Sequence, residues 1–95
     1  MIERRTGKRF DVNWPVKVEG RDGRRAIRGE GRILNISTGG ALVDLTEPVR
    51  QGIRLNVYIK LPFKKDNWMK YAAEVLRVED GHAAVRFEGP RPSFA

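Results

Sequence analysis

The sequence predicts an all-β domain, an antiparallel barrel or sandwich of six short strands. Apolar residues recur at every second position in several segments, which is the period of a half-buried strand. Glycine, proline and aspartate separate these segments at short intervals, and no segment has a convincing helical period. The 95 residues are enough for one small domain but not for a second core, so a multidomain enzyme is excluded.

The first expected strand, residues 12–19, is followed by an Arg-Asp-Gly turn and by a second strand over residues 24–36. The apolar side chains of the first strand share one face: Val12, Trp14, Val16 and Val18. Pro15 on the other face has no N–H to donate, which indicates an edge or a bulge at that position. Gly29 and Gly31 weaken the second strand and predict a bulge where the sheet bends sharply.

The third and fourth expected strands cover residues 41–45 and 55–61. Their alternating apolar residues are Ala41, Val43 and Leu45 on the third, and Leu55, Val57, Ile59 and Leu61 on the fourth. Two glycines precede the third strand, a Thr-Glu-Pro turn follows it, and a proline closes the fourth. Both strands should therefore turn one face to the core.

The last two strands form a predicted hairpin. Residues 69–79 alternate until the apolar positions change parity at Leu76, as one inserted bulge residue would cause. An Asp-Gly dipeptide then suits a two-residue turn with positive φ. The sixth strand covers about residues 82–88, with Val85 and Phe87 facing inward.

The composition favours an anionic partner and argues against catalysis. Nineteen Lys and Arg against twelve Asp and Glu leave a net charge of +7, which favours nucleic acid, nucleotides or an anionic membrane surface. There is no cysteine, and the only histidine, His82, stands beside a hairpin turn without a triad partner or a companion ligand. We therefore expect a protein that is not an enzyme and that has no catalytic residue and no metal site.

The chain shows no targeting or membrane signal. Its basic beginning lacks the apolar stretch of a signal peptide, and no later segment approaches the roughly 20 apolar residues of a membrane span. The lack of cysteine fits a reducing compartment. We expect a soluble, cytoplasmic protein.

A basic stretch opens the chain: Arg4, Arg5, Lys8 and Arg9. The offset from Arg5 to Arg9 would place both on one face if the segment wrapped round a compact anion. A guanidinium pairs bidentately with phosphate or with the O6/N7 edge of guanine, and it stacks on a base. The alternative is a solvated arm that only aids solubility.

A polar segment, residues 35–40, joins the second and third strands. Asn35 and Ser37 share a parity, so the amide and the hydroxyl should point the same way. Gly39 and Gly40 allow a tight reversal and a close approach of the backbone to a ligand. Because the same residue types also make ordinary turns, a simple turn is the competing interpretation.

Together the two segments resemble a known family. Arg5-Thr6-Gly7-Lys8-Arg9 resembles the RxxxR motif and Asn35-Ile36-Ser37-Thr38-Gly39-Gly40 resembles the [D/N]xSxxG motif, which jointly define the PilZ family of cyclic di-GMP receptors. The resemblance covers almost the whole chain and implies a six-stranded antiparallel β-barrel. It also implies the ligand contacts: Arg5 and Arg9 as a clamp on guanine edges and phosphates, and Asn35, Ser37, Gly39 and Gly40 on the barrel surface.

Three further residues are expected near the ligand. Arg4, directly before the first motif, is similar to the long arginine that in relatives favours two intercalated cyclic di-GMP molecules per chain over one. Lys8 and Arg77 are weaker candidates, and the alternative for Arg77 is a plain surface role. Apart from this ligand, the resemblance implies no cofactor.

The resemblance divides the chain into a flexible basic arm over residues 1–11, a barrel over residues 12–88 and a tail over residues 89–95. Many relatives carry a C-terminal helix, which the short, proline-rich tail cannot supply, so we expect this helix to be short or absent. The surface that it usually covers would then be open to a partner or to a homodimer.

The leading hypothesis is a non-enzymatic cyclic di-GMP receptor that transmits the messenger level to an unidentified protein partner. One alternative is a small basic barrel that binds single-stranded nucleic acid through a row of arginines: Arg21, Arg24, Arg25, Arg28 and Arg32. It is disfavoured because alternation turns Trp14 and Phe87 inward, whereas the side of Tyr58, Trp68 and Tyr71 stays open. The other alternative, a degenerate PilZ domain that binds only protein, is disfavoured by the intact motifs.

Overall fold

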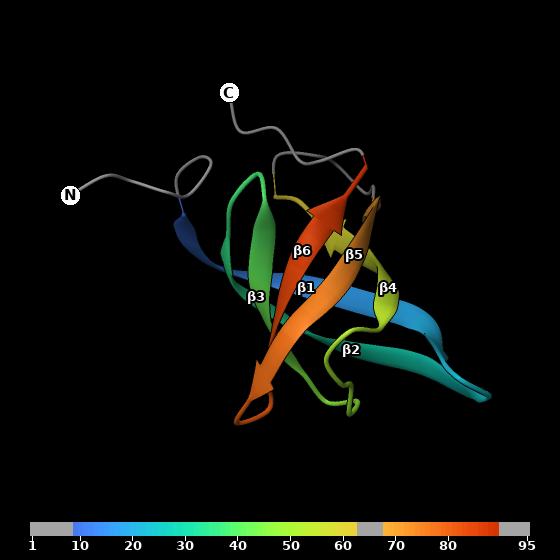
Figure 1. Ribbon diagram of the computed structural model, residues 1–95. Coiled ribbons are helices and arrows are strands. Elements are labelled where there is room, and N and C mark those ends of the chain that lie inside the picture. The colour runs from blue at the N-terminus through green and yellow to red at the C-terminus, as the bar shows by residue number, and fades with distance from the viewer. Residues whose placement is uncertain (1–8, 63–67, 90–95) are drawn as a thin grey trace.

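The chain winds into six strands that close into one antiparallel barrel (Figure 1). The computed structural model describes residues 9–62 and 68–89. In chain order the strands are β1 (Phe10–Asp22), β2 (Arg25–Ile36), β3 (Gly40–Leu45), β4 (Arg54–Lys60), β5 (Trp68–Glu79) and β6 (His82–Glu88). Round the barrel they pair in the order β1-β2-β3-β6-β5-β4. The all-β, six-stranded barrel is thereby confirmed, and the described ranges contain no helix.

The predicted alternation produces the core. On β3, β4 and β6 the buried side chains are apolar and occupy alternate positions, and no polar side chain among the described residues is buried. The bulkiest fully buried residues are Phe87, Ile27, Ile33, Ile36 and Ile59. The ring of Tyr71 packs on that of Phe87 with centroids 5.4 Å apart, so Tyr71 belongs to the core. Val12 and Trp14 are only partly buried and pack against its rim.

Strand β1 starts two residues earlier than the expected Val12. Phe10 pairs with Ile36 of β2, so Phe10 and Asp11 of the expected arm belong to the strand. A register shift between Asp11 and Trp14 inserts one extra residue into β1. Pro15 follows this bulge and lies just outside the pairing of β1 with β4, which begins one residue later. The edge or bulge indicated by Pro15 is confirmed.

The bulge predicted at Gly29 and Gly31 is wrong. The β1–β2 register runs without interruption through both glycines. They serve close packing instead, because a Cβ on Gly31 would overlap the backbone oxygen of Asp44 and one on Gly29 would lie 2.6 Å from the Cβ of Glu47. The bulge in β2 falls further on, between Ile33 and Asn35.

The β5–β6 hairpin agrees with its sequence pattern. The register slips by one residue between Val75 and Arg77, so Leu76 is the predicted bulge residue. Asp80 and Gly81 form the turn with φ of 50° and 79°, a pair of left-handed residues that suits a two-residue hairpin. Beyond the bulge β5 no longer pairs with β4, and Leu76 remains 41% exposed.

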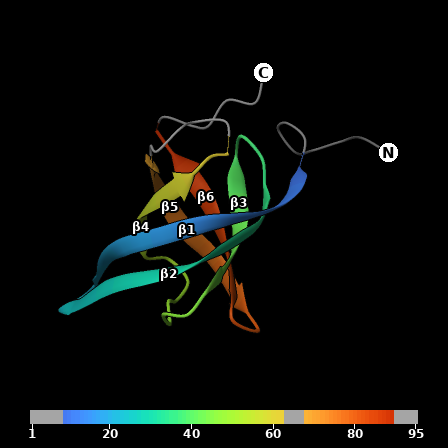
Figure 2. The ribbon, with the colours of Figure 1, turned by 180° about the vertical axis from the view of Figure 1, so that it is seen from behind.

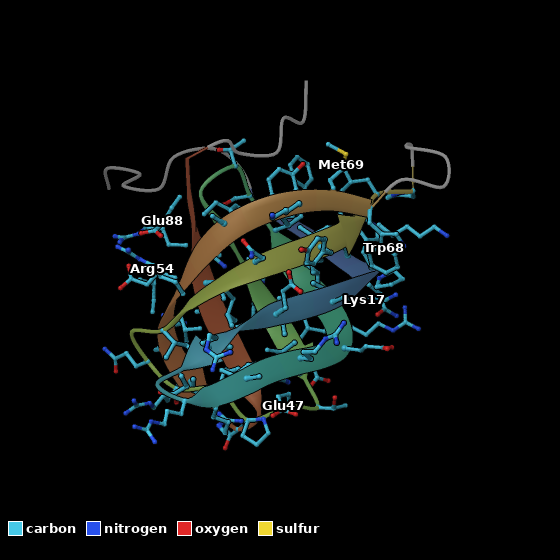
Figure 3. The ribbon with its side chains drawn as sticks, turned by 90° about the vertical axis from the view of Figure 1, so that its right-hand side faces the viewer. Lys17, Glu47, Arg54, Trp68, Met69 and Glu88 are labelled. Atoms are coloured by element: carbon cyan, nitrogen blue, oxygen red, sulfur yellow. The ribbon has the colours of Figure 1, made fainter. Side chains whose placement is uncertain are left out.

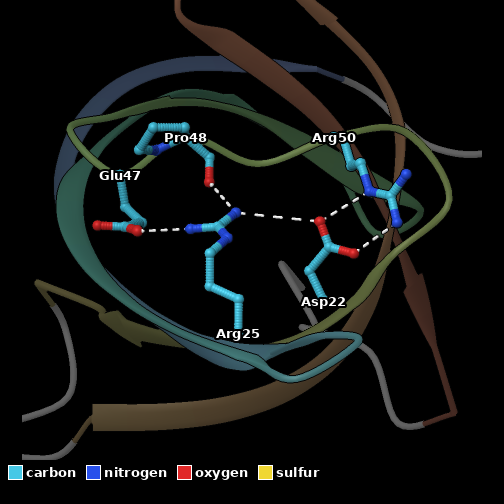
Figure 4. Close-up of polar contacts among 5 residues, drawn as sticks. All are labelled: Asp22, Arg25, Glu47, Pro48 and Arg50. Carbon is cyan, nitrogen blue, oxygen red and sulfur yellow. Dashed lines mark hydrogen bonds and ion pairs between the residues drawn. The ribbon is translucent and has the colours of Figure 1, made fainter.

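An ion-pair cluster ties the β1–β2 hairpin to the β3–β4 connection (Figure 4). Arg50 donates two hydrogen bonds to the Asp22 carboxylate, at 2.7 Å and 2.6 Å. Arg25 donates to Glu47 at 2.9 Å and to the backbone oxygen of Pro48 at 3.0 Å. Figures 1 and 2 show this hairpin crossing the other strands and projecting beyond them, so the cluster holds the part of the hairpin that lies past its pairing with β4.

Candidate ligand-binding site

The two sequence motifs meet on the outside of the barrel. The β1–β2 register brings Asp11 opposite Asn35, which places the last arginine of the first motif beside the first residue of the second. Arg9 Nη1 donates a hydrogen bond to Asn35 Oδ1 at 2.8 Å, although 26 positions separate them in sequence. This contact brings one residue of each motif together on the barrel surface.

Asn35 owes its position to two bulges. One residue is inserted into β1 just before Trp14, and another into β2 between Ile33 and Asn35. A bulge bends its strand and changes the direction of the side chains that follow. Ile33 and Ile36 both face the core across this irregularity, while Asn35 stays half-buried and pairs with Leu42 on β3. The strand therefore bends where the second motif begins.

The rest of the second motif forms a tight turn between β2 and β3. The Ser37 N–H donates to the Gly40 oxygen at 2.8 Å, and the Gly39 N–H donates to Ser37 Oγ at 3.2 Å. The Ser37 hydroxyl in turn lies 3.5 Å from the Gly40 oxygen, as a donor. On the barrel side, the N–H of Phe87 donates to the Gly39 oxygen at 2.9 Å, so strand β6 anchors the turn.

The two glycines of the turn have different roles. A Cβ on Gly40 would overlap the backbone oxygen of Val85, so only glycine lets β3 approach β6 at this point. A Cβ on Gly39 would meet nothing nearer than Ser37 Oγ, at 3.9 Å. Gly40 is therefore required by packing, whereas Gly39 leaves open space beside the turn.

Arg86 is a neighbour of this site that the sequence interpretation missed. It pairs with Gly40 across β3 and β6 and with Glu74 across β6 and β5. Its Nη2 donates to Glu74 Oε1 at 2.6 Å, and its side chain is 52% exposed. The alternation of β6 could have identified it, because the inward Val85 and Phe87 force the residue between them outward.

The remaining predicted residues are Arg4, Arg5, Lys8 and Arg77. Arg4, Arg5 and Lys8 lie outside the described residues. Arg77 stands opposite Ala84 and forms an exposed ion pair with Glu79 at 3.5 Å. It lines a small cavity of about 210 Å³ near the β5–β6 turn, together with Leu42, Glu79, Asp80, His82 and Ala84. The assignment of Arg77 to the ligand remains a prediction.

The described site offers hydrogen bonds and positive charge. Arg9 and Arg86 flank a turn that carries the Asn35 amide and the Ser37 hydroxyl, a set suited to an anionic, hydrogen-bonding ligand. Within residues 9–62 and 68–89 there is no group of three His, Cys, Asp or Glu side chains that could hold a metal ion. The same residues include no helix long and apolar enough to cross a membrane.

A larger groove of about 880 Å³ lies elsewhere, on the outside of β1, β2 and β4. Figure 3 shows Lys17 and Trp68 together on this side, with Lys17 Nζ 4.7 Å from the ring centroid. The Tyr58 hydroxyl donates to Glu19 at 2.6 Å, which raises the pKa of Tyr58. Both aromatic residues are thus engaged by neighbours within the protein, and the groove contains no residue of either motif.

Comparison with known proteins relates the chain to PilZ domains. The family model described as PilZ domain matches residues 3–93. The PilZ domain of CeSA from a cellulose-synthesizing bacterium has a TM-score of 0.70 and 21% identity, over 87% of this chain and 82% of that chain. No curated protein matches the chain.

Two further structures share the fold. The inhibitor of motility MotI/DgrA from Bacillus subtilis has a TM-score of 0.72 and 24% identity, over 93% of this chain but only 44% of its own. The PilZ domain of YcgR from Escherichia coli, solved with cyclic di-GMP, has a TM-score of 0.64 and 17% identity, over 90% of this chain and 78% of that chain. At these identities the likeness shows a common barrel.

Proposed function

The chain belongs to the PilZ family, and on that premise we propose that it is a cyclic di-GMP receptor that passes the level of the messenger to a protein partner and catalyses no reaction. The observation that carries the proposal is the hydrogen bond from Arg9 to Asn35, which unites the two motifs on the barrel surface. The YcgR domain, which shares the barrel, was solved with this ligand.

The geometry suggests how the ligand is held. Asn35 keeps the Arg9 guanidinium at the barrel surface, so the ligand meets a cation that is already near its working position. The partner is a neutral amide, which offers both a donor and an acceptor. Exchange of this contact for a phosphate or for the O6/N7 edge of guanine breaks no ion pair. Arg5, from the same motif, completes the clamp in this proposal.

The proposal includes transmission through the arm. Arg9 lies directly before β1, and β1 pairs with β2 beside the motif turn. A ligand that draws Arg5 and Arg9 together would reorganise residues 1–8 on the outside of the barrel. That change alters the surface that a protein partner meets, with a second copy of the chain as one such partner. The contact between the two motifs supports ligand binding over a role in protein binding alone.

Calorimetric titration tests the proposal. The natural chain should saturate with cyclic di-GMP, while GTP and a short single-stranded oligonucleotide should not compete at equal concentration. Arg9→Ala and Arg5→Ala should each weaken binding by about 1 to 3 kcal/mol, the worth of a good bidentate contact. Arg21→Ala is the matched control, because Arg21 is exposed on the far hairpin and donates only to the backbone oxygen of Arg24. Equal affinities of the Arg9→Ala and Arg21→Ala proteins would refute the clamp.

A further inference from the structure

We infer that Arg86 is an additional ligand-binding residue and that Glu74 is the anion which the ligand displaces from it. The inference rests on the proposed function and concerns the same site. In the structure the Arg86 guanidinium is paired with Glu74 at 2.6 Å. When cyclic di-GMP binds, its phosphodiester takes the place of this carboxylate.

The position of Arg86 is set by backbone register. Arg86 stands directly opposite Gly40, where the lack of a side chain lets the backbones of β3 and β6 approach closely. The next residue on β6 holds the turn through the hydrogen bond from Phe87 N to the Gly39 oxygen. Residues directly opposite each other in an antiparallel pair have their Cα atoms about 5 Å apart. The Arg86 side chain therefore emerges beside the motif turn, on the side away from Arg9.

The contact of Arg86 with Glu74 leaves most of the guanidinium uncommitted. Arg86 uses one of its five N–H groups in the bond to Glu74, and its side chain is half exposed. Arg50 at the other end of the barrel differs, because it donates through two nitrogens to both carboxylate oxygens of Asp22. A single exposed ion pair contributes little to stability, so a better acceptor can exchange with it.

Charge decides the role of Glu74. The Glu74 carboxylate repels a phosphodiester that approaches Arg86, and it is the partner of the arginine that the phosphodiester would use. After the exchange Glu74 retains a neighbouring cation, because β4 places Arg54 opposite it. Arg54 is at present 3.3 Å from Glu88, the pair that Figure 3 labels on one side of the barrel. Ligand binding would thus rearrange ion pairs from β6 across β5 to β4.

Titration of four proteins with cyclic di-GMP tests the inference: the natural chain and the variants Arg86→Ala, Glu74→Gln and Arg21→Ala. Arg86→Ala should lower the affinity about five-fold or more, the effect of losing a charge-assisted hydrogen bond. Glu74→Gln keeps the size of the side chain but removes its charge, and it should raise the affinity about two- to five-fold. Arg21→Ala controls for the loss of one positive charge. Thermal unfolding should show that all four proteins are folded.

Each result decides a separate point. If the natural chain does not bind, the proposed function fails and this inference fails with it. If the natural chain binds and Arg86→Ala resembles Arg21→Ala, only the role of Arg86 is overturned. If Arg86→Ala weakens binding and Glu74→Gln weakens it too, Glu74 positions Arg86, and the displacement is overturned.

Discussion

Replacing Gly39 and Gly40 by alanine, one at a time, should show which glycine of the motif turn is needed for close packing and which only favours a turn. Neither Gly39 nor Gly40 has a positive φ, so the two substitutions differ only in the space that the new Cβ finds. At Gly40 it would lie far inside the 3.0 Å that Cβ atoms respect, against the backbone oxygen of Val85. Backbone cannot rotate aside, and Val85 is itself 3% exposed in the core, so β6 cannot retreat without disturbing the core.

Gly40→Ala should lower the free energy of unfolding by about 1 to 3 kcal/mol, the usual effect of overpacking. In a domain of this size each kcal/mol lowers the melting temperature by about 4 to 8 °C. Gly39→Ala should stay within about 0.5 kcal/mol of the natural chain, because its Cβ meets only Ser37 Oγ at 3.9 Å. Thermal and urea unfolding of both variants measure the difference. Equal melting temperatures would show that β3 and β6 are not packed as closely as described.

Three further outcomes are expected. Arg4→Leu, a change outside the described residues, should shift binding from two cyclic di-GMP molecules per chain toward one. An aliphatic side chain cannot cover a second guanine or offset its phosphates. A calorimetric stoichiometry of one ligand per chain for both proteins would contradict this. The hydrogen bonds from Arg50 lower the pKa of Asp22 below its ordinary 3.8, so their stabilisation is present above that value and is lost as the pH falls through the lower folded-state pKa. In urea unfolding, the free energy of unfolding of the Asp22→Asn protein should therefore fall less below about pH 4 than that of the natural chain. Parallel pH profiles of the two proteins would argue against the Asp22–Arg50 pair. The bond to Glu19 raises the pKa of Tyr58 above 10.0 and burial raises that of Tyr71, so a folded-state absorbance titration should show neither phenol ionising at its ordinary pKa.

The fold was largely predictable because the information is local. Alternation with a period of two assigns residues to the inner or outer face of each strand, and the buried residues of β3 and β4 are those that the pattern selected. The bulge at Leu76 could be predicted because an inserted residue shifts the apolar residues of a strand from even to odd positions or the reverse. Asp80 and Gly81 reveal their turn because few other residues tolerate two successive left-handed conformations.

Gly29 and Gly31 show where local reasoning failed. Glycine in a strand is consistent with a bulge or with the close approach of another segment, and the sequence does not say which. In the structure β3 and the connection after it press against β2 at these positions. The bulge occurs instead between Ile33 and Asn35, where no glycine marks it.

The sequence by itself determined the class of fold, the core positions of the regular strands β3, β4 and β6, and the two motifs that identify the family, because each depends on residue types at short, regular spacing. Tertiary structure alone decided which residues of distant segments meet. The pairing of Asp11 with Asn35, which brings Arg9 to Asn35, and the ladder Gly40–Arg86–Glu74 both depend on register, which is a property of paired strands. A shift of one residue would turn every side chain to the opposite face, so closure of the barrel around its core is what places these groups together.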